Sequence, residues 1–191
     1  MIFETERLIL RPWLESDAAD LYECAKDPLV GPAAGWPVHT SIENSKGIIH
    51  DVLSAAGTYA VVLRETNQAI GSVGIMPTRA MHPDVKSYEL EIGYWLGRSY
   101  WGQGLIPEAV ERIMRHCFED MNCPGIWCGY YEGNKSLNVF RKNAALHIII
   151  QNIIRRMISW EIYEQSTLLM CPKNSGKIGI SVRIVNNCKL F

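Results

Sequence analysis

The chain has 191 residues, with 19 Lys and Arg against 20 Asp and Glu, which gives a formal net charge of −1. This length predicts one domain with a sizeable core, and the near-neutral charge does not favour a nucleic acid as partner. Glu4, Glu6 and Arg7 interrupt any secretory signal, and no apolar run is long enough to span a bilayer. The six cysteines lack the paired spacing of a zinc site or a disulfide framework. We therefore expect a cytoplasmic protein in a reducing compartment.

The first predicted elements are a strand and a helix. Residues 5–13, TERLILRPW, alternate as a strand does, with Leu8 and Leu10 on one face. Ser16 and Asp17 can cap the helix that follows.

A loop and a second helix come next. Residues 27–40 are rich in Pro and Gly and are predicted to form a loop, in which Trp36 is expected to pack over the core rather than contact a ligand. Ser41 and Glu43 predict the start of a helix that continues to about residue 56. Its apolar side chains are expected to face the core: Ile42, Ile48, Ile49, Val52 and Leu53.

A hairpin is predicted from two further strands. Residues 58–64 and 69–76 have strand composition, and residues 66–68 between them carry a turn signal. Gly71 and Gly74 lie inside the second strand, where glycine indicates a bulge or the close approach of a ligand.

The most informative stretch covers residues 88–110. Its first half alternates as a strand, and its second half repeats apolar pairs at helical spacing, with Pro107 in the first helical turn. Between them, Gly102 and Gly104 flank one residue. Free N–H groups at a helix start carry partial positive charge, and glycines let a phosphate approach the backbone, so this turn is a candidate anion site.

Two common phosphate motifs are absent from this turn. No Lys-Ser or Lys-Thr follows Gly104, which argues against a nucleotide-hydrolysing P-loop. The third glycine of the dinucleotide fingerprint is also missing at its required spacing. On the glycines alone, a plain turn that uses glycine for its geometry remains an equal alternative.

The remaining pattern predicts a strand over residues 125–131 and a helix that begins within residues 134–142. The element order is then β-α-α-β-β-β-α-β-α. This order predicts an α/β sandwich with one mixed sheet between helices.

The segments EIGYWL at 91–96 and YWGQGLIPEA at 100–109 resemble the acetyl-CoA segment of the GNAT acetyltransferase superfamily. They are most similar to the branch that includes ribosomal-protein N-terminal acetyltransferases (RimJ/RimL-like). Gly102 and Gly104 match the family loop, whereas Ser99 stands where Arg or Gln is frequent. The resemblance covers about residues 1–142. It implies the GNAT acyl-CoA N-acyltransferase fold, a mixed, mostly antiparallel sheet flanked by helices, with acetyl-CoA between the central strand and strand 125–131.

The resemblance also implies which residues bind acetyl-CoA. The central strand would pair its backbone with pantetheine, the glycine loop would hold the diphosphate, and a second segment begins at Asn134. The implied contacts are Tyr94, Trp95, Leu96, Trp101, Gly102, Gln103, Gly104, Leu105 and Asn134. No metal is expected in this chemistry.

Two acidic residues are candidates for the general base. Glu91 is the first choice by resemblance and Glu89 the second, since both lie on one strand face. Either carboxylate could instead bind the cation of the acceptor or be solvated at a sheet edge. The proton donor to the thiolate is open, because Phe140 stands near the place where the family often has Tyr, and Tyr130 or Tyr131 could substitute.

The resemblance ends after Lys142. Where the family has Gly-Phe and then two strands, this chain continues with an isoleucine-rich segment, 143–191, in which those strands are not recognisable. We hypothesise a frameshift: joining the last base of each codon to the first two of the next permits the missing Gly-Phe in the expected place, which the encoding DNA can refute. Alternatively, residues 146–158 form an apolar helix face that packs on the domain, dimerises or lies on a membrane surface.

The sequence thus predicts a GNAT core over 1–142 and an atypical tail over 143–191. The expected activity is transfer of an acetyl group from acetyl-CoA to a primary amine, either a protein N-terminus or a small molecule, by direct attack on the thioester with a carboxylate as base. Acetyl-CoA and the amine are the expected partners, together with a second copy of the chain in a homodimer. The rival hypothesis is a non-catalytic acyl-CoA-binding domain or the inactive product of a disrupted gene.

Overall fold

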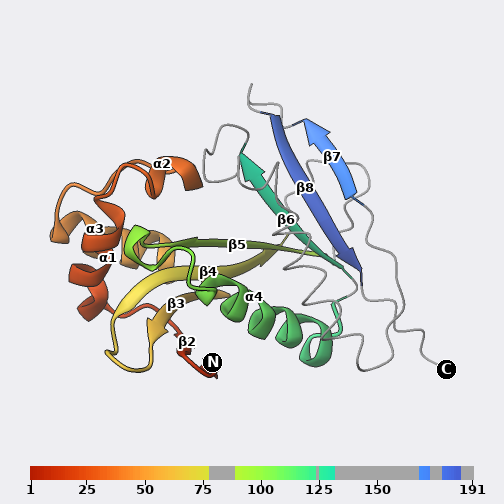
Figure 1. The fold of residues 1–191 in the computed structure, drawn as a ribbon, viewed down its shortest axis with the longest axis horizontal. Helices are drawn as coiled ribbons and strands as arrows, with labels where there is room; N and C mark the ends of the chain where they lie inside the picture. Colours follow the sequence, from red (N-terminus) through yellow and green to blue (C-terminus); the bar gives the residue numbers. More distant parts are fainter. Residues whose placement is uncertain (78–88, 124, 132–167, 173–177, 186–191) are drawn as a thin grey trace. The chain divides into compact units, whose positions relative to one another are not determined.

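The computed structural model describes residues 1–77, 89–123, 125–131, 168–172 and 178–185, the backbone alone from residue 127 onward. The chain divides into two compact units (Figure 1). The first comprises Met1–Met76 and Ile92–Ile113, and the second comprises Pro77–Glu91 and Met114–Phe191. Across these described ranges, no helix has the length and apolar character needed to cross a membrane.

The first unit is built on consecutive strands of a sheet in the order β1-β2-β3-β4-β5. The pairs β1–β2, β2–β3 and β3–β4 are antiparallel. The strands are β1 Phe3–Glu4, β2 Leu8–Arg11, β3 Thr58–Leu63, β4 Ala69–Pro77 and β5 Leu90–Leu96. The predicted hairpin is confirmed as β3 and β4, and its turn contains Asn67 with a φ of 58°.

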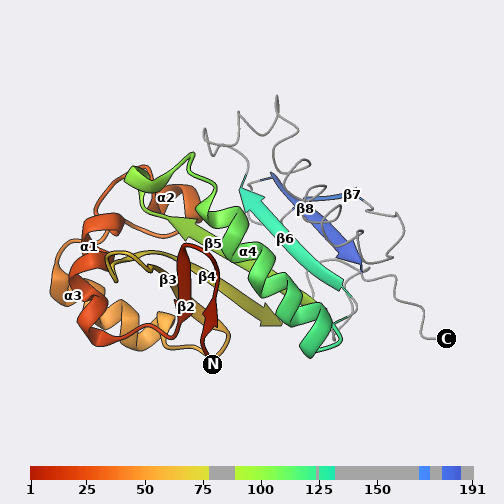
Figure 2. The ribbon, with the colours of Figure 1, turned by 60° about the horizontal axis from the view of Figure 1, so that its bottom comes forward.

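Helices cover the two faces of this sheet (Figure 2). On one face, Ala60 and Val62 of β3 belong to a buried cluster with residues of α1 (Ala18–Ala25). On the other face, the guanidinium of Arg112 in α4 (Leu105–Arg115) lies 4.4 Å from the ring centroid of Phe3. Phe3 pairs with Leu10 and Leu10 with Val61, so alternation along β3 places Val61 on the face of α4 and its neighbours Ala60 and Val62 on the face of α1.

A bulge interrupts the pairing of β3 and β4 between Val61 and Val62. The extra residue is Ile70 of β4, so the bulge lies directly beside Gly71 and is one of the two alternatives that this glycine indicated. A Cβ on Gly71 would stand 2.5 Å from the carbonyl oxygen of Trp95. The close neighbour that requires glycine here is therefore strand β5, not a ligand.

A buried ion pair joins the end of β2 to the first helical segment, η1 (Glu15–Asp17). The Arg11 guanidinium donates two hydrogen bonds to the Asp17 carboxylate, at 2.7 and 2.8 Å. Asp17 also accepts a hydrogen bond from the backbone N–H of Leu14 at 2.9 Å. Asp17 stands at the N-cap position of α1, one of the two residues predicted to cap this helix, but its side chain makes no cap hydrogen bond there, because its carboxylate accepts from Arg11 and Leu14.

The second predicted helix begins as expected. The hydroxyl of Ser41 accepts a hydrogen bond from the Asn44 N–H at 3.0 Å and caps α3 (Ile42–Ile48). The helix then continues with wider π-type turns, η2 (Ile49–Leu53). Because the turn widens, the 3.6-residue spacing no longer holds there, and Val52, which was expected to be buried, is 54% exposed. The expected burial also fails at Ile42, the first residue of α3, which is 44% exposed.

The segment predicted as a loop contains one short helix, α2 (Gly31–Ala34). Pro32 lies in its first turn, where a missing N–H costs little, and Gly35 ends it with a φ of 90°. Proline and glycine here mark the two ends of a helix rather than a loop throughout.

The second unit contains three described strands in the order β6-β8-β7, paired antiparallel. They are β6 Gly125–Tyr131, β7 Leu168–Pro172 and β8 Ile178–Val185. Strand β6 was predicted. Strands β7 and β8 lie in the tail where no strand was recognised, and the three Ile and two Val residues of β8 suit a sheet without any family motif. The alternative tail helix, 146–158, lies outside the described residues.

Replacement of Asp17 by Ala is expected to lower the free energy of unfolding by about 3 kcal/mol, since it leaves the Arg11 charge buried without its partner. The matched control is Glu15→Ala in the same turn, which removes an exposed ion pair with Lys46 and should cost about 0.5 kcal/mol. Chemical denaturation measures both. Equal losses for the two variants would contradict a special role for the buried pair.

Candidate functional site

The turn between β5 and α4 has the backbone that the sequence predicted. Gly102 and Gly104 have φ values of 78° and 75°, in the left-handed region that other residues rarely adopt. No atom lies within 4 Å of the position that a Cβ on Gly102 would take. Glycine is therefore required at this position by the backbone conformation and not by a crowded neighbour.

Two side chains hold this loop against the residues that precede it. The indole N–H of Trp101 donates to the carbonyl of Leu96 at 2.8 Å, which ties the loop to the end of β5. The side-chain amide of Gln103 donates to the carbonyl of Ser99 at 3.1 Å. The loop thus folds onto its own segment, while Trp101 keeps 37% of its surface exposed.

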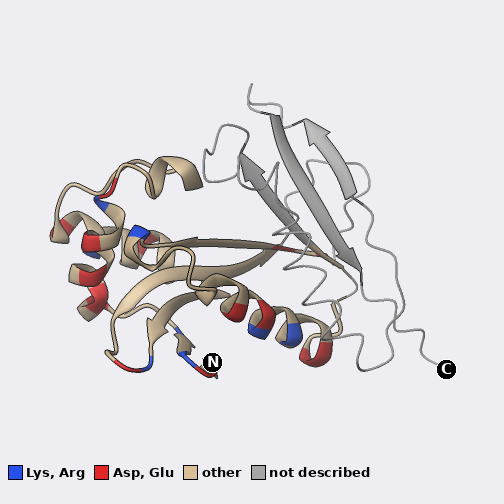
Figure 3. Cartoon of the chain, in the orientation of Figure 1, with Lys and Arg blue, Asp and Glu red and all other residues tan. Residues whose placement is uncertain are grey.

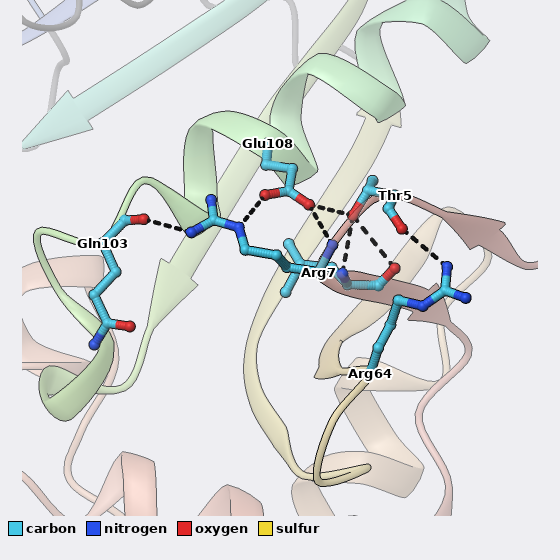
Figure 4. A network of polar contacts seen from close by, with 6 residues as sticks. Thr5, Arg7, Arg64, Gln103 and Glu108 are labelled. Atoms are coloured by element: carbon cyan, nitrogen blue, oxygen red, sulfur yellow. Dashed lines mark hydrogen bonds and ion pairs between the residues drawn. The ribbon is translucent and has the colours of Figure 1, made fainter.

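A second set of bonds joins the loop to the start of the chain (Figure 4). Arg7 donates through Nη1 to the carbonyl of Gln103 at 2.9 Å and through Nε to the Glu108 carboxylate at 2.7 Å. Glu108 lies in the first turn of α4 and also accepts from the backbone N–H of Arg7 at 2.9 Å and from the Thr5 hydroxyl at 2.6 Å. The turn between β1 and β2 is therefore hydrogen-bonded to both the glycine loop and the start of α4.

These bonds keep Glu108 ionised. Burial alone would raise the pKa of its carboxyl group, but the hydrogen bonds from Thr5 and Arg7 and the charge of Arg7 outweigh it, so the pKa is lowered. The helix start also favours a negative charge at this position. At neutral pH, the Arg7–Glu108 pair is thus a true ion pair.

The two candidate bases differ in exposure. Glu91 lies within β5 and is partly exposed, whereas no part of Glu89, directly before this strand, is exposed. Apart from Glu91, strand β5 carries no charged residue, which Figure 3 shows as a nearly uncharged ribbon. Solvent access therefore favours Glu91 over Glu89 as a group that meets a dissolved amine.

Trp95 follows on the same face of β5 and packs in an aromatic cluster. Its ring stacks on Trp13 at a centroid distance of 6.1 Å and meets Trp36 edge-on at 5.6 Å. The buried Trp13 indole N–H donates to the Ser72 hydroxyl at 3.2 Å. The prediction that Trp36 packs is confirmed, because it lies against the buried cluster beside α1.

His39 adjoins this cluster, with its ring 5.2 Å from that of Trp36. Its Nδ1 lies 2.8 Å from the hydroxyl of Ser45, and both residues are buried. Burial lowers the pKa of His39, so the imidazole is neutral near neutral pH. His39 therefore packs beside Trp36 as a neutral, buried side chain.

Comparison with known proteins decides the family. A family model described as an acetyltransferase (GNAT) domain matches residues 7–145. The chain belongs to this family. It is 31% identical over 123 residues to the uncharacterized N-acetyltransferase p20 of Bacillus licheniformis, a match that covers 62% of this chain and 66% of that protein.

Solved GNAT structures share the fold. The acetyltransferase (GNAT family) of Bacillus anthracis is 17% identical, with a TM-score of 0.67 over 97% of this chain and 98% of that one. RimL, a ribosomal L7/L12 alpha-N-protein acetyltransferase solved with coenzyme A, is 18% identical, with a TM-score of 0.61 over 99% and 100% of the two chains. The predicted GNAT fold, a mixed sheet with flanking helices, is confirmed.

The described part of this GNAT domain contains most of the predicted donor-site residues. The residues from Tyr94 to Leu96 lie in β5, and those from Trp101 to Leu105 form the loop and the first residue of α4. Asn134 and Phe140 fall outside the described residues, and Tyr130 and Tyr131 are described only by the backbone of β6. Within the described ranges, no group of three or more His, Cys, Asp or Glu could hold a metal ion.

Replacement of Gly102 by Ala should destabilise the fold by about 1 kcal/mol, because a methyl group strains a left-handed backbone even where space is open. The matched control is Gly47→Ala in α3, which also meets no atom within 4 Å. Its position in a helix should make that change stabilising by about 0.5 kcal/mol. Thermal melts of both variants measure the difference. A neutral or stabilising Gly102→Ala would contradict the strain.

Proposed function

We propose that this GNAT domain is an acetyl-CoA-dependent N-acetyltransferase that acts on a primary amine, either a protein N-terminus or a small molecule. The observation that carries the proposal is the pair of left-handed glycines, Gly102 and Gly104, directly before α4. Such a loop offers backbone N–H groups to an anion at the positive end of a helix. We also propose a cytoplasmic location, which follows from the scattered thiols.

The donor would be held mainly by backbone groups. The loop 101–104 and the first residue of α4 would bind the diphosphate, where the helix start favours negative charge. By the family resemblance, the backbone of residues 94–96 in β5 would pair with pantetheine. An N–H of this strand could also stabilise the negative charge that develops on the thioester oxygen during attack.

Glu91 is the proposed base. Its carboxylate would take a proton from the ammonium form of the acceptor, directly or through water. The freed amine nitrogen then attacks the thioester carbon and forms the new N–C bond. The C–S bond breaks, the nitrogen releases its second proton to give the neutral amide, and a proton is delivered to the thiolate, for which Tyr130 and Tyr131 remain candidate donors. This sequence requires no metal and no covalent enzyme intermediate.

The acceptor class rests on the resemblance of residues 91–109 to the ribosomal-protein branch. RimL and this chain share a fold at 18% identity, and the amine that RimL modifies does not transfer at that distance. A panel of acceptors should therefore include short peptides with free N-termini as well as small amines. Formation of a homodimer is a separate proposal that light scattering can test.

Replacement of Glu91 by Gln should lower kcat by about a hundredfold or more, because it removes the base and keeps the size of the side chain. The dissociation constant for acetyl-CoA should stay nearly unchanged, since the donor contacts lie in the backbone. Steady-state kinetics with an accepted amine and calorimetry measure the two effects. The matched control is Glu65→Gln, which removes an exposed charge from the hairpin turn and should leave both unchanged.

Two results would reject this role. An unaltered rate in Glu91→Gln would show that the carboxylate is not the base, and a large loss of acetyl-CoA affinity would assign it to binding. Saturable acetyl-CoA binding by the natural chain with no turnover on any amine would instead identify a non-catalytic acyl-CoA-binding domain. The absence of both binding and turnover would favour the inactive product of a disrupted gene.

A further inference from the structure

Arg7 occupies an unusual place for a residue so near the start of the chain. Its guanidinium bonds at once to the Glu108 carboxylate in the first turn of α4 and to the carbonyl of Gln103 in the glycine loop. The guanidinium is a rigid planar fork, so its donors keep a fixed relative direction. Arg7 thus couples the position of the helix start to the orientation of one loop peptide (Figure 4).

That peptide carries a donor for the proposed diphosphate. The carbonyl of Gln103 and the N–H of Gly104 belong to one planar unit, and in a trans peptide they point in opposite directions. Because the carbonyl points to Arg7, at 2.9 Å from Nη1, the N–H of Gly104 points away from the guanidinium. Rotation of this peptide would replace an N–H donor by a carbonyl oxygen, which repels an anion.

Arg7 also balances a charge. The carboxylate of Glu108 is ionised and lies beside the loop, where alone it would repel a phosphate. With Arg7 in place, the pair is neutral. Removal of the arginine would leave a negative charge next to the loop, so both effects of Arg7 favour an anionic ligand.

We infer that Arg7 is a positioning residue for the donor diphosphate: it fixes the Gln103–Gly104 peptide with its N–H toward the ligand and neutralises Glu108. This inference rests on the proposed function, namely that the loop binds acetyl-CoA. It extends that function to a residue that lies 96 residues from the peptide it orients.

The test uses the full chain and two ligands. Coenzyme A carries the diphosphate, and pantetheine lacks it. Arg7→Gln should bind coenzyme A about tenfold more weakly by calorimetry, the effect of one lost charge-assisted hydrogen bond. Its affinity for pantetheine, measured by ligand-observed NMR, should stay unchanged. The matched control is Arg64→Gln, which is equally exposed at 45% and donates to Thr5 and Glu4 without contact to the loop.

A second variant separates positioning from simple stability. Glu108→Gln perturbs the same ion pair, so its thermal melt should fall as that of Arg7→Gln does, but it keeps the arginine and removes the negative charge. Its affinity for coenzyme A should therefore be equal to or higher than that of the natural chain. Equal weakening in both variants, or an equal loss of pantetheine binding in Arg7→Gln, would overturn the inference and leave the proposed function intact. Failure of the natural chain to bind coenzyme A would overturn both.

Discussion

The hydrogen bonds to the Glu108 carboxylate are the constraint on which the rest of the loop geometry depends. Thr5 and Arg7 donate three of them from the turn between β1 and β2. Apolar packing holds α4 against the sheet, but that force has no preferred direction and does not fix where the helix starts. Directional bonds to a single carboxylate do fix it. The position of the first turn of α4 thus contributes to the placement of the loop N–H groups, together with the bonds that Arg7, Trp101 and Gln103 make within and to the loop.

Strand β5 connects the glycine loop to Glu91, the proposed base. Its end is held by the hydrogen bond from Trp101 to Leu96 and by the packing of Trp95 against two other tryptophans. Gly71 allows the neighbouring strand β4 to approach the same backbone closely. Glu91 lies four residues before Trp95 on the same strand face, so the packing of Trp95 restrains the strand that carries it. The proposed base is thus partly exposed on a packed strand.

The sequence predicted the elements that have a clear period: the β3–β4 hairpin, strand β5, helix α4 and the two glycines before it. The sequence-based prediction failed where the helical period changes: the widened turn after Ile48 leaves Val52 exposed. It also missed the Arg7–Glu108 pair, because these residues lie 101 positions apart and no local pattern joins them. An acidic residue in the first turn of α4 was a signal, but helix electrostatics already explains an acid there without any partner.

The tail bears on which part of the proposed function would tolerate a change of sequence. Strand β8 pairs with β6, and β7 pairs with β8, in regular register although their segment lacks the family pattern, because a ladder is formed by backbone groups and requires no motif. Most of the proposed donor contacts are likewise made by the backbone, within residues 94–105. Acceptor choice differs, since it depends on particular side chains, and by the family resemblance the tail supplies some of them. A tail translated from a shifted frame would therefore keep its strands and donor binding and lose selectivity for the amine first.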